Sequence, residues 1–310
     1  MYTSLLIGMF LISQLLPLDY LSHDLTYQLD ASNQATITTT ILDTGLIEQP
    51  PRPEKMSQSL GIETTAKSAL VLDPDSHTIL FQKDPVAIRP IASITKLMTA
   101  LVFLENNPGW ETEIEIIKAD QASSGNVDLK VGDKVTVSDL FYSSLVGSAN
   151  NATEALVRST ELSRDQFIEI MNQRAQAMGL DQTVFEDLTG LSANNLSSAK
   201  DIARLASFAF NNSDINGVTV FPEYEFKTIN TKRSIKVTNT NKLFGSLMSI
   251  NGAKTGFTNE AGYCMVLRSK GNGGHQVISV VLGSDSSDER FQEIKGLVSW
   301  AFENWSWLNN

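Results

Sequence analysis

A serine and a lysine, Ser93 and Lys96, stand three positions apart at the start of a segment with a helical pattern. Residues at this spacing lie on one face of a helix, so the hydroxyl and the amine can meet. The first turn of a helix also carries free N–H groups and a partial positive charge, which stabilise the oxyanion that forms when a serine attacks a carbonyl. Lysine accepts a proton only when neutral, and its ordinary pKa is about 10.4. The pair therefore predicts acyl transfer, provided that burial and a nearby cation such as Lys254 lower the pKa of Lys96.

A second hydroxyl follows an apolar helical pattern in the run Ser148-Ala149-Asn150. Ser148 can pass a proton between Lys96 and a leaving amine. Asn150 can hold Lys96 or a substrate amide by hydrogen bonds. The sequence thus predicts that these two short side chains complete a proton network around the lysine.

The third element is Lys254-Thr255-Gly256, which opens a strand pattern. Lys254 and Thr255 offer a cation and a hydroxyl to a terminal carboxylate. Gly256 lets the backbone of a substrate lie against the strand, whose edge is the predicted docking surface.

The histidines and the cysteine give weaker signals for other kinds of catalytic site. Ser-His-Asp chemistry needs a histidine beside the serine, but there is no G-x-S-x-G run, and His77 and His275 are predicted to be exposed turn residues. Cys264 is the only cysteine, so it has no internal disulfide partner, and no Cys/His spacing predicts a zinc site. We expect neither a metal nor another cofactor.

The composition of the 310-residue chain suits one globular domain of roughly 250 residues with an additional segment. The formal net charge of -11 argues against nucleic acid as a partner, because no basic stripe is available to displace counterions from a phosphate backbone.

The chain begins with an apolar stretch, and residues 1–22 are predicted to be an export or membrane-anchor segment. It lacks a basic region ahead of the apolar run and an A-x-A-like cleavage site after it. Residues 23–64 are polar, rich in threonine and broken by prolines, which is typical of a linker. The catalytic domain is expected to span residues 65–310, outside the cytoplasm.

Strand patterns lie at both ends of this domain and helical patterns lie in its middle. The predicted elements are a hairpin over 68–72 and 78–81, a helix over 93–104, helices within 138–210 that begin at the cap candidates Ser138 and Asp139, strands over 263–267 and 277–282, and a helix over 288–305. This order predicts an α/β fold of the α+β type, with an antiparallel sheet flanked by helices and a helical subdomain.

The three ordered motifs give the sequence a family resemblance. Over residues 65–305 the chain resembles the low-molecular-mass penicillin-binding proteins, which are D-alanyl-D-alanine carboxypeptidases. The runs that carry the resemblance are Arg89-Pro-Ile-Ala-Ser-Ile-Thr-Lys-Leu-Met-Thr-Ala100, Ser148-Ala-Asn-Asn-Ala152, Asp187-Leu-Thr-Gly-Leu191, Asn239-Thr-Asn-Lys-Leu243, Asn251-Gly-Ala-Lys-Thr-Gly-Phe-Thr258 and Gly283 followed by Arg290-Phe291.

The resemblance implies a β-lactamase/transpeptidase-like fold and a serine carboxypeptidase that removes the terminal D-alanine from peptidoglycan stem peptides. It implies that Ser93 is acylated, that Lys96 is the general base, and that β-lactams are covalent inhibitors. The oxyanion hole would be the N–H groups of Ser93 and Phe257, and Arg290 would join Lys254 and Thr255 in binding the carboxylate.

Three departures and three alternatives accompany this interpretation. Ala149 stands where glycine is commoner and Asn151 where aspartate is frequent, and the C-terminal β-domain and tail anchor of many relatives are missing, so the N-terminal segment is expected to serve as the anchor. A D-alanyl-D-alanine endopeptidase would use the same residues, and a class A β-lactamase would need an acid such as Glu186. A non-catalytic penicillin-binding sensor would keep the fold without needing both Ser93 and Lys96.

Overall fold

The computed structural model describes residues 26–29, 35–38, 52–122 and 127–307. The chain separates into two compact units, residues 1–49 and 50–310. In the first unit, β1 (Thr26–Leu29) pairs antiparallel with β2 (Ala35–Thr38) inside the predicted linker. The predicted apolar segment 1–22 lies outside the described residues.

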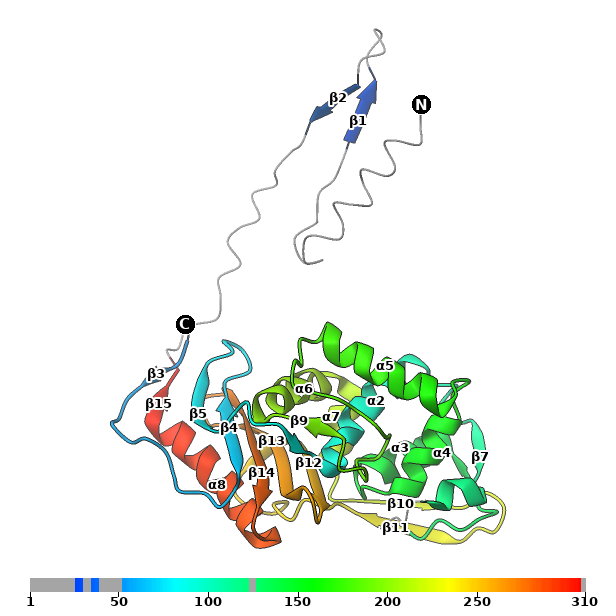
Figure 1. The fold of residues 1–310 in the computed structure, drawn as a ribbon. Coiled ribbons are helices and arrows are strands. Elements are labelled where there is room, and N and C mark those ends of the chain that lie inside the picture. The colour runs from blue at the N-terminus through cyan, green and yellow to red at the C-terminus, as the bar shows by residue number, and fades with distance from the viewer. Residues whose placement is uncertain (1–25, 30–34, 39–51, 123–126, 308–310) are drawn as a thin grey trace. The chain divides into compact units, whose positions relative to one another are not determined.

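A five-stranded antiparallel sheet forms the centre of the second unit (Figure 1). Its order is β12-β13-β14-β4-β5, so strands from the two ends of the domain are neighbours. The strands are β4 (Ser68–Leu72), β5 (Ile79–Lys83), β12 (Ser249–Thr258), β13 (Gly262–Lys270) and β14 (Gln276–Ser284).

Both faces of this sheet are buried. Alternate residues of β14 point to different cores: Ile278 and Val280 face the helical side, while Val277 and Val281 pack with the C-terminal helix. Because neither face meets solvent, β13 and β14 are nearly continuous apolar runs.

Helices cover both faces (Figure 1). The C-terminal helix contacts β13 and β14 from one side, and α6 contacts the same sheet from the other, together with the rest of the helical region. The α-helices of the described part are α2 (Lys96–Glu105), α3 (Val137–Leu145), α4 (Asn150–Arg158), α5 (Arg164–Ala177), α6 (Ala199–Asn211), α7 (Ser213–Thr219) and α8 (Ser287–Asn304). The predicted α+β fold is thereby confirmed.

Short strand pairs tie the periphery together. They are β3 (Glu54–Lys55) with β15 (Trp305–Ser306), β6 (Arg89–Pro90) with β9 (Leu196–Ser197), β7 (Glu113–Glu115) with β8 (Lys134–Thr136), and β10 (Glu223–Lys227) with β11 (Ser234–Thr238). None of the described helices is long and apolar enough to span a membrane.

The compact unit begins before the expected start at residue 65. Residues 54–55 pair with the end of the chain, and Trp300 Nε1 donates to Ser59 Oγ at 2.7 Å. The stretch shows no periodicity because backbone pairing and single side chains, rather than an amphipathic face, hold it. Residues 52–64, predicted to be linker, therefore pack as part of the folded unit.

One predicted helix cap differs from the structure. The N-cap of α3 is Thr136, and Asp139 is its reciprocal partner in a capping box; Ser138 caps nothing there. Asp139 sits three residues after Thr136, which is the spacing that a capping box requires.

Candidate active site

The candidate nucleophile does not lie in the α-helix itself. Ser93 is part of a 3₁₀ turn, η2 (Ala92–Thr95), and the α-helix α2 begins at Lys96. Ala92, just before the serine, has a positive φ of 47°, a conformation that costs energy for a residue with a side chain. The predicted helix over 93–104 is thus divided into a strained turn that carries Ser93 and a helix that carries Lys96.

The side chain of Lys96 is fully buried and meets three oxygen atoms. Its Nζ lies 3.0 Å from Ser93 Oγ, 2.7 Å from Asn150 Oδ1 and 2.7 Å from the carbonyl oxygen of Thr189. A neutral amine has two N–H donors and one lone pair. Since Asn150 Oδ1 and the Thr189 carbonyl can only accept, they take the two donors, and the lone pair is left to face the Ser93 hydroxyl.

Burial is the main cause of the altered titration of Lys96. It lowers the pKa from 10.5 to about 7, while the negative charges of Asp187 and Glu154 act in the opposite direction. A shift of this size disfavours the ammonium form by about 5 kcal/mol relative to water. The predicted lowering is present, and burial, the first of its two predicted causes, is the leading one.

Ser148 lies on the tight connection between α3 and α4. Its backbone has a positive φ of 56°, and its Oγ accepts a hydrogen bond from Lys254 Nζ at 2.8 Å. Asn150 opens α4 two residues later, which directs its amide toward Lys96. The connection therefore links the two buried lysines through one hydroxyl and one amide.

Strand β12 carries the third motif at the edge of the sheet. Lys254, Thr255 and Gly256 lie in its second half, not at its start as expected, because the strand continues through a bulge between Ile250 and Ala253. In the sequence the Asn-Gly pair inside this bulge looks like a strand breaker.

Gly256 has a packing role that the motif alone does not reveal. A Cβ at this position would come within 2.9 Å of the Ile91 carbonyl oxygen and 3.0 Å of the Ser93 nitrogen. Only glycine lets the edge strand approach the 3₁₀ turn this closely.

Lys254 is buried as well, with 2% of its surface exposed. Burial lowers its pKa well below the ordinary value, and the positive charges of Lys96 and Arg290 lower it further. Beside it, Thr255 Oγ1 lies 2.5 Å from Oγ1 of Thr240, a residue for which the sequence predicts no role. A lysine amine and two hydroxyls thus lie together at the strand edge.

Arg290 reaches the cleft from α8 and is buried. Its Nη1 donates to the carbonyl oxygens of Gly256 at 3.0 Å and Cys264 at 3.2 Å, and its Nε has no partner in the described structure. Phe257 lies at the rim, 48% exposed and stacked on Tyr263.

The loop from Asp187 to Gly190, for which the sequence predicts no role, supplies an acceptor to Lys96. The Asp187 carboxylate accepts from the backbone N–H groups of Thr189 and Gly190 at 2.7 and 2.6 Å. Burial would raise the pKa of Asp187, but these bonds, with those from Ser192 and Asn195, hold it below its ordinary value. An Asp two residues before a Thr-Gly pair is the sequence signal for such a turn.

All nine predicted site residues belong to one assembly. The cleft has a volume of about 310 Å³. Its lining is Ser93, Ser148, Asn150, Gly190, Leu191, Thr240, Thr255, Gly256, Phe257, Thr258 and Arg290, and Lys96 and Lys254 are buried behind it with bonds to Ser93 and Ser148.

Glu186, His77 and His275, which the sequence offered as alternatives, do not line the cleft. None of the described residues that line the cleft is an aspartate, a glutamate or a histidine. Glu186 is exposed and bonds to Ser192 and Asn194 instead. His77 is exposed in the β4–β5 turn, and His275 stacks on Trp307. No group of three or more His, Cys, Asp or Glu side chains in the described part is placed to hold a metal ion.

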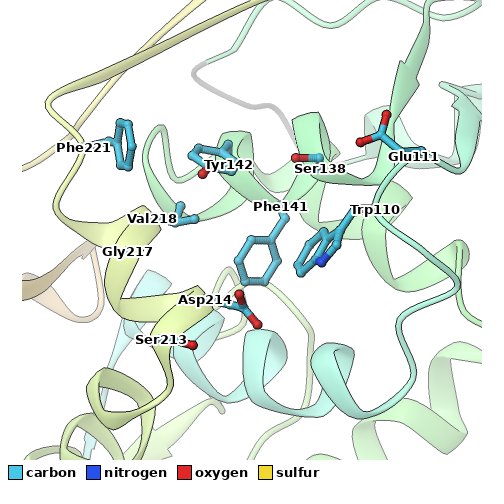
Figure 2. A pocket seen from close by; sticks show the side chains of 10 residues that line it. All are labelled: Trp110, Glu111, Ser138, Phe141, Tyr142, Ser213, Asp214, Gly217, Val218 and Phe221. Atoms are coloured by element: carbon cyan, nitrogen blue, oxygen red, sulfur yellow. The ribbon is translucent and has the colours of Figure 1, made fainter.

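A separate hollow of about 380 Å³ lies among α3, α7 and the loop before β7. Figure 2 shows it bordered by aromatic side chains, including Trp110, Phe141, Tyr142 and Phe221. None of the predicted site residues lines it, so the constellation described above is confined to the cleft beside β12.

Comparison with known proteins decides the family. The sequence profile described as peptidase S11, D-alanyl-D-alanine carboxypeptidase, matches residues 53–286. The chain belongs to the D-alanyl-D-alanine carboxypeptidase family. This confirms the resemblance and identifies the protein as a serine peptidase of a family that acts on the cell wall, outside the cytoplasm.

Individual members of the D-alanyl-D-alanine carboxypeptidase family carry more than one activity name. The chain is 35% identical to a D-alanyl-D-alanine endopeptidase of Haemophilus influenzae over 225 residues, covering 72% of this chain and 76% of the relative. It is 29% identical to the D-alanyl-D-alanine carboxypeptidase DacF of Bacillus subtilis over 246 residues, covering 77% and 63%. Among solved structures, the Streptomyces K15 DD-transpeptidase is 31% identical with a TM-score of 0.73, covering 79% of this chain and all of that one.

Proposed function

We propose that the protein removes the terminal D-alanine from peptidoglycan stem pentapeptides through an acyl-enzyme on Ser93. The observation that carries this proposal is the buried Lys96 amine, 3.0 Å from Ser93 Oγ, with both of its donors taken by other acceptors. A non-catalytic sensor has no need of a base oriented in this way.

In the acylation step, Ser93 Oγ attacks the carbonyl carbon of the penultimate D-alanine. Lys96 Nζ takes the hydroxyl proton, and the N–H groups of Ser93 and Phe257 stabilise the oxyanion. The close approach of the 3₁₀ turn to β12 at Gly256 supports this role, because it brings the two backbone segments together.

Departure of the terminal D-alanine requires a proton on its amine. Ser148 Oγ accepts from Lys254, so its own O–H is free to point toward the leaving group. The proton passes from Lys96 to the amine through Ser148, the C–N bond breaks, and D-alanine leaves with the proton.

Hydrolysis then uses the same base. No carboxylate from the described residues lines the cleft, so Lys96, neutral again, is the group that deprotonates the incoming water. The water attacks the ester, the Ser93 oxygen regains its proton, and the tetrapeptide leaves. A class A β-lactamase mechanism would need an acid in the cleft to activate this water, and Glu186 does not line the cleft.

Recognition of the substrate rests on its terminal carboxylate. We assign this role to Lys254, Thr255 and Arg290, and Gly256 keeps the strand edge open for the peptide backbone. A bound carboxylate would raise the depressed pKa of Lys254 and restore its charge, so the ion pair would form as the substrate binds.

The second candidate function is a D-alanyl-D-alanine endopeptidase, which cuts cross-links. This candidate is favoured because the Haemophilus influenzae relative, which is 35% identical to the chain, is named a D-alanyl-D-alanine endopeptidase. Ser93 and Lys96 would have the same roles in both activities. The two activities would differ in the leaving group that the cleft accepts, a single D-alanine or the cross-linked peptide.

Two further features complete the proposal. β-Lactams would acylate Ser93, a view supported by the similar penicillin-binding protein D2 of Listeria monocytogenes, whose structure is described in a cefotaxime-bound form.

Residues 1–22 would attach the protein to the membrane, with the catalytic unit outside the cytoplasm facing the peptidoglycan.

Mass spectrometry of reaction products tests the proposal. The protein is incubated with a pentapeptide ending in D-Ala-D-Ala and, separately, with cross-linked dimers. Release of one D-alanine from the pentapeptide, absent in Ser93→Ala, is the expected result. Cleavage of the dimers alone would establish the endopeptidase, and penicillin binding without either product would indicate a sensor.

A further inference from the structure

A second hollow continues the active-site cleft past Phe257. It has a volume of about 400 Å³ and shares Phe257 with the cleft. Its walls come from β6, from the connection between β12 and β13, and from the end of β14. Both hollows are within the size range of small-ligand sites, roughly 300–1,000 Å³.

The direction of the substrate along β12 determines which part of it reaches this hollow. On the function proposed above, the terminal carboxylate lies at Lys254 and Thr255, and the scissile carbonyl lies at the Phe257 N–H. An extended peptide that follows the strand edge then continues past Thr258. The part of the substrate beyond the scissile bond on that side is the acyl donor, the stem peptide that becomes attached to Ser93.

The hollow offers one half-buried cation without an acidic partner in the described structure. Arg89 Nε donates to Ser68 Oγ at 2.9 Å, and Ser68 is fully buried, so the guanidinium is held from one side. The neighbouring Lys67 is paired with Asp285 at 3.5 Å, and both of these side chains are more than half exposed. Glu260 also borders the hollow but is exposed to solvent.

These contacts suit recognition of a carboxylate. A guanidinium presents its N–H donors in a planar fork that matches the two oxygens of a carboxylate, and partial burial strengthens the bond. The stacked rings of Phe257 and Tyr263, 4.3 Å apart, form an apolar wall beside it. We propose that this hollow binds the acyl-donor stem peptide, with Arg89 pairing with a carboxylate that lies upstream of the D-Ala-D-Ala terminus.

Two peptides ending in D-Ala-D-Ala test this assignment on the unaltered protein. They are identical except that the acidic residue two positions before the D-Ala pair carries a free carboxyl in one and a carboxamide in the other. We expect kcat/KM for D-alanine release to be about 10- to 100-fold higher for the free carboxyl, the range of a charge-assisted hydrogen bond. Equal values for the two peptides would overturn the proposal.

Matched variants identify the residue responsible. Arg89→Gln should bring the ratio of the two kcat/KM values close to one, whereas Lys67→Gln, which removes a cation already paired with Asp285, should keep the preference. A preference that persists in Arg89→Gln would contradict the role of Arg89. Acylation by labelled penicillin is measured in each variant, and it reports whether Ser93 and Lys96 remain in place.

This design separates the inference from the function on which it rests. If neither peptide loses D-alanine, the proposed carboxypeptidase fails, and the subsite falls with it. If both peptides are processed at equal rates, the carboxypeptidase stands and the subsite alone is wrong.

Discussion

At the scale of single residues, the protonation of Lys96 decides whether Ser93 can react. Within the described structure, Lys96 is bonded to a hydroxyl, an amide and a carbonyl but forms no ion pair with a carboxylate. Burial therefore favours the neutral form, which is the form that a base requires.

The first prediction concerns pH. Because the pKa of Lys96 is about 7, the neutral fraction falls as pH decreases through that value, and the rate of Ser93 acylation should fall about tenfold for each further pH unit. Stopped-flow acylation by a fluorescent penicillin between pH 5 and pH 9 measures this. A rate that stays level from pH 8 down to pH 5 would exclude Lys96 as the base.

The second prediction concerns Asp187, a positioning residue that acts through Thr189. Its negative charge raises the pKa of Lys96, so Asp187→Asn should move the midpoint of the acylation profile to lower pH and reduce the maximal rate roughly tenfold. Asp201 is a matched control, since it is also buried and bonded to loop groups, at Gln182 and Thr183, but does not act on Lys96. Asp201→Asn should leave the midpoint in place; an unmoved midpoint in Asp187→Asn would refute the assignment.

The residues of this site could be predicted to different extents. Ser93, Lys96, Ser148, Asn150 and Lys254 were identifiable because their types and spacing have a chemical purpose. The Thr189 carbonyl could not be found, because any residue has a carbonyl and only the fold aims it. The pairing of Thr240 with Thr255 depends likewise on where a loop passes the sheet edge.

At the scale of elements, the site depends on the close approach of β12 to the 3₁₀ turn. Gly256 permits this approach, and Gly190 permits another, since a Cβ there would lie 1.9 Å from the Ala92 carbonyl oxygen. The strained conformation at Ala92 is thus enclosed by two glycines from distant segments.

The third prediction tests this approach. Gly256→Ala places a methyl group against the backbone of Ile91 and Ser93, so we expect at least a tenfold slower acylation and a loss of about 1–3 kcal/mol in the free energy of unfolding. Gly217 in α7, at the hollow of Figure 2, is the control: no atom lies within 4 Å of its added Cβ, and Gly217→Ala should leave acylation unchanged. Urea unfolding and penicillin acylation measure both effects, and equal behaviour of the two variants would contradict the packing argument.

Element types were predictable where periodicity is strong, and boundaries were less so. The hairpin of β13 and β14 follows from two apolar runs around a glycine-rich turn. The start of β12 was missed because its bulge contains an Asn-Gly pair, and the α3 cap was misplaced by two residues, from Thr136 to Ser138.

At the scale of the whole molecule, the two ends of the catalytic unit close on each other. Strand β4 pairs with β14, and β3 pairs with β15. The first pairing is implied by strand patterns at both ends of the sequence, but the second consists of two residues on each side and leaves no pattern to read.

The fourth prediction follows from that closure. A chain that begins at Thr65 loses the β3–β15 pair and the bond of Trp300 to Ser59, whereas a chain that begins at Pro50 keeps them. We expect the shorter chain to lose about 2 kcal/mol or more, which lowers Tm by roughly 4–8 °C. Calorimetry of the two chains measures the difference, and identical Tm values would show that residues 52–64 contribute nothing to the fold.

Whether Ser93 is the nucleophile is tested most directly by the mass of the intact protein after brief incubation with benzylpenicillin, followed by peptide mapping. We expect one covalent adduct, located on the peptide that contains Ser93 and absent in Ser93→Ala. An adduct that persists in Ser93→Ala, or a folded wild-type protein that acquires none, would contradict the assignment of Ser93 as the nucleophile.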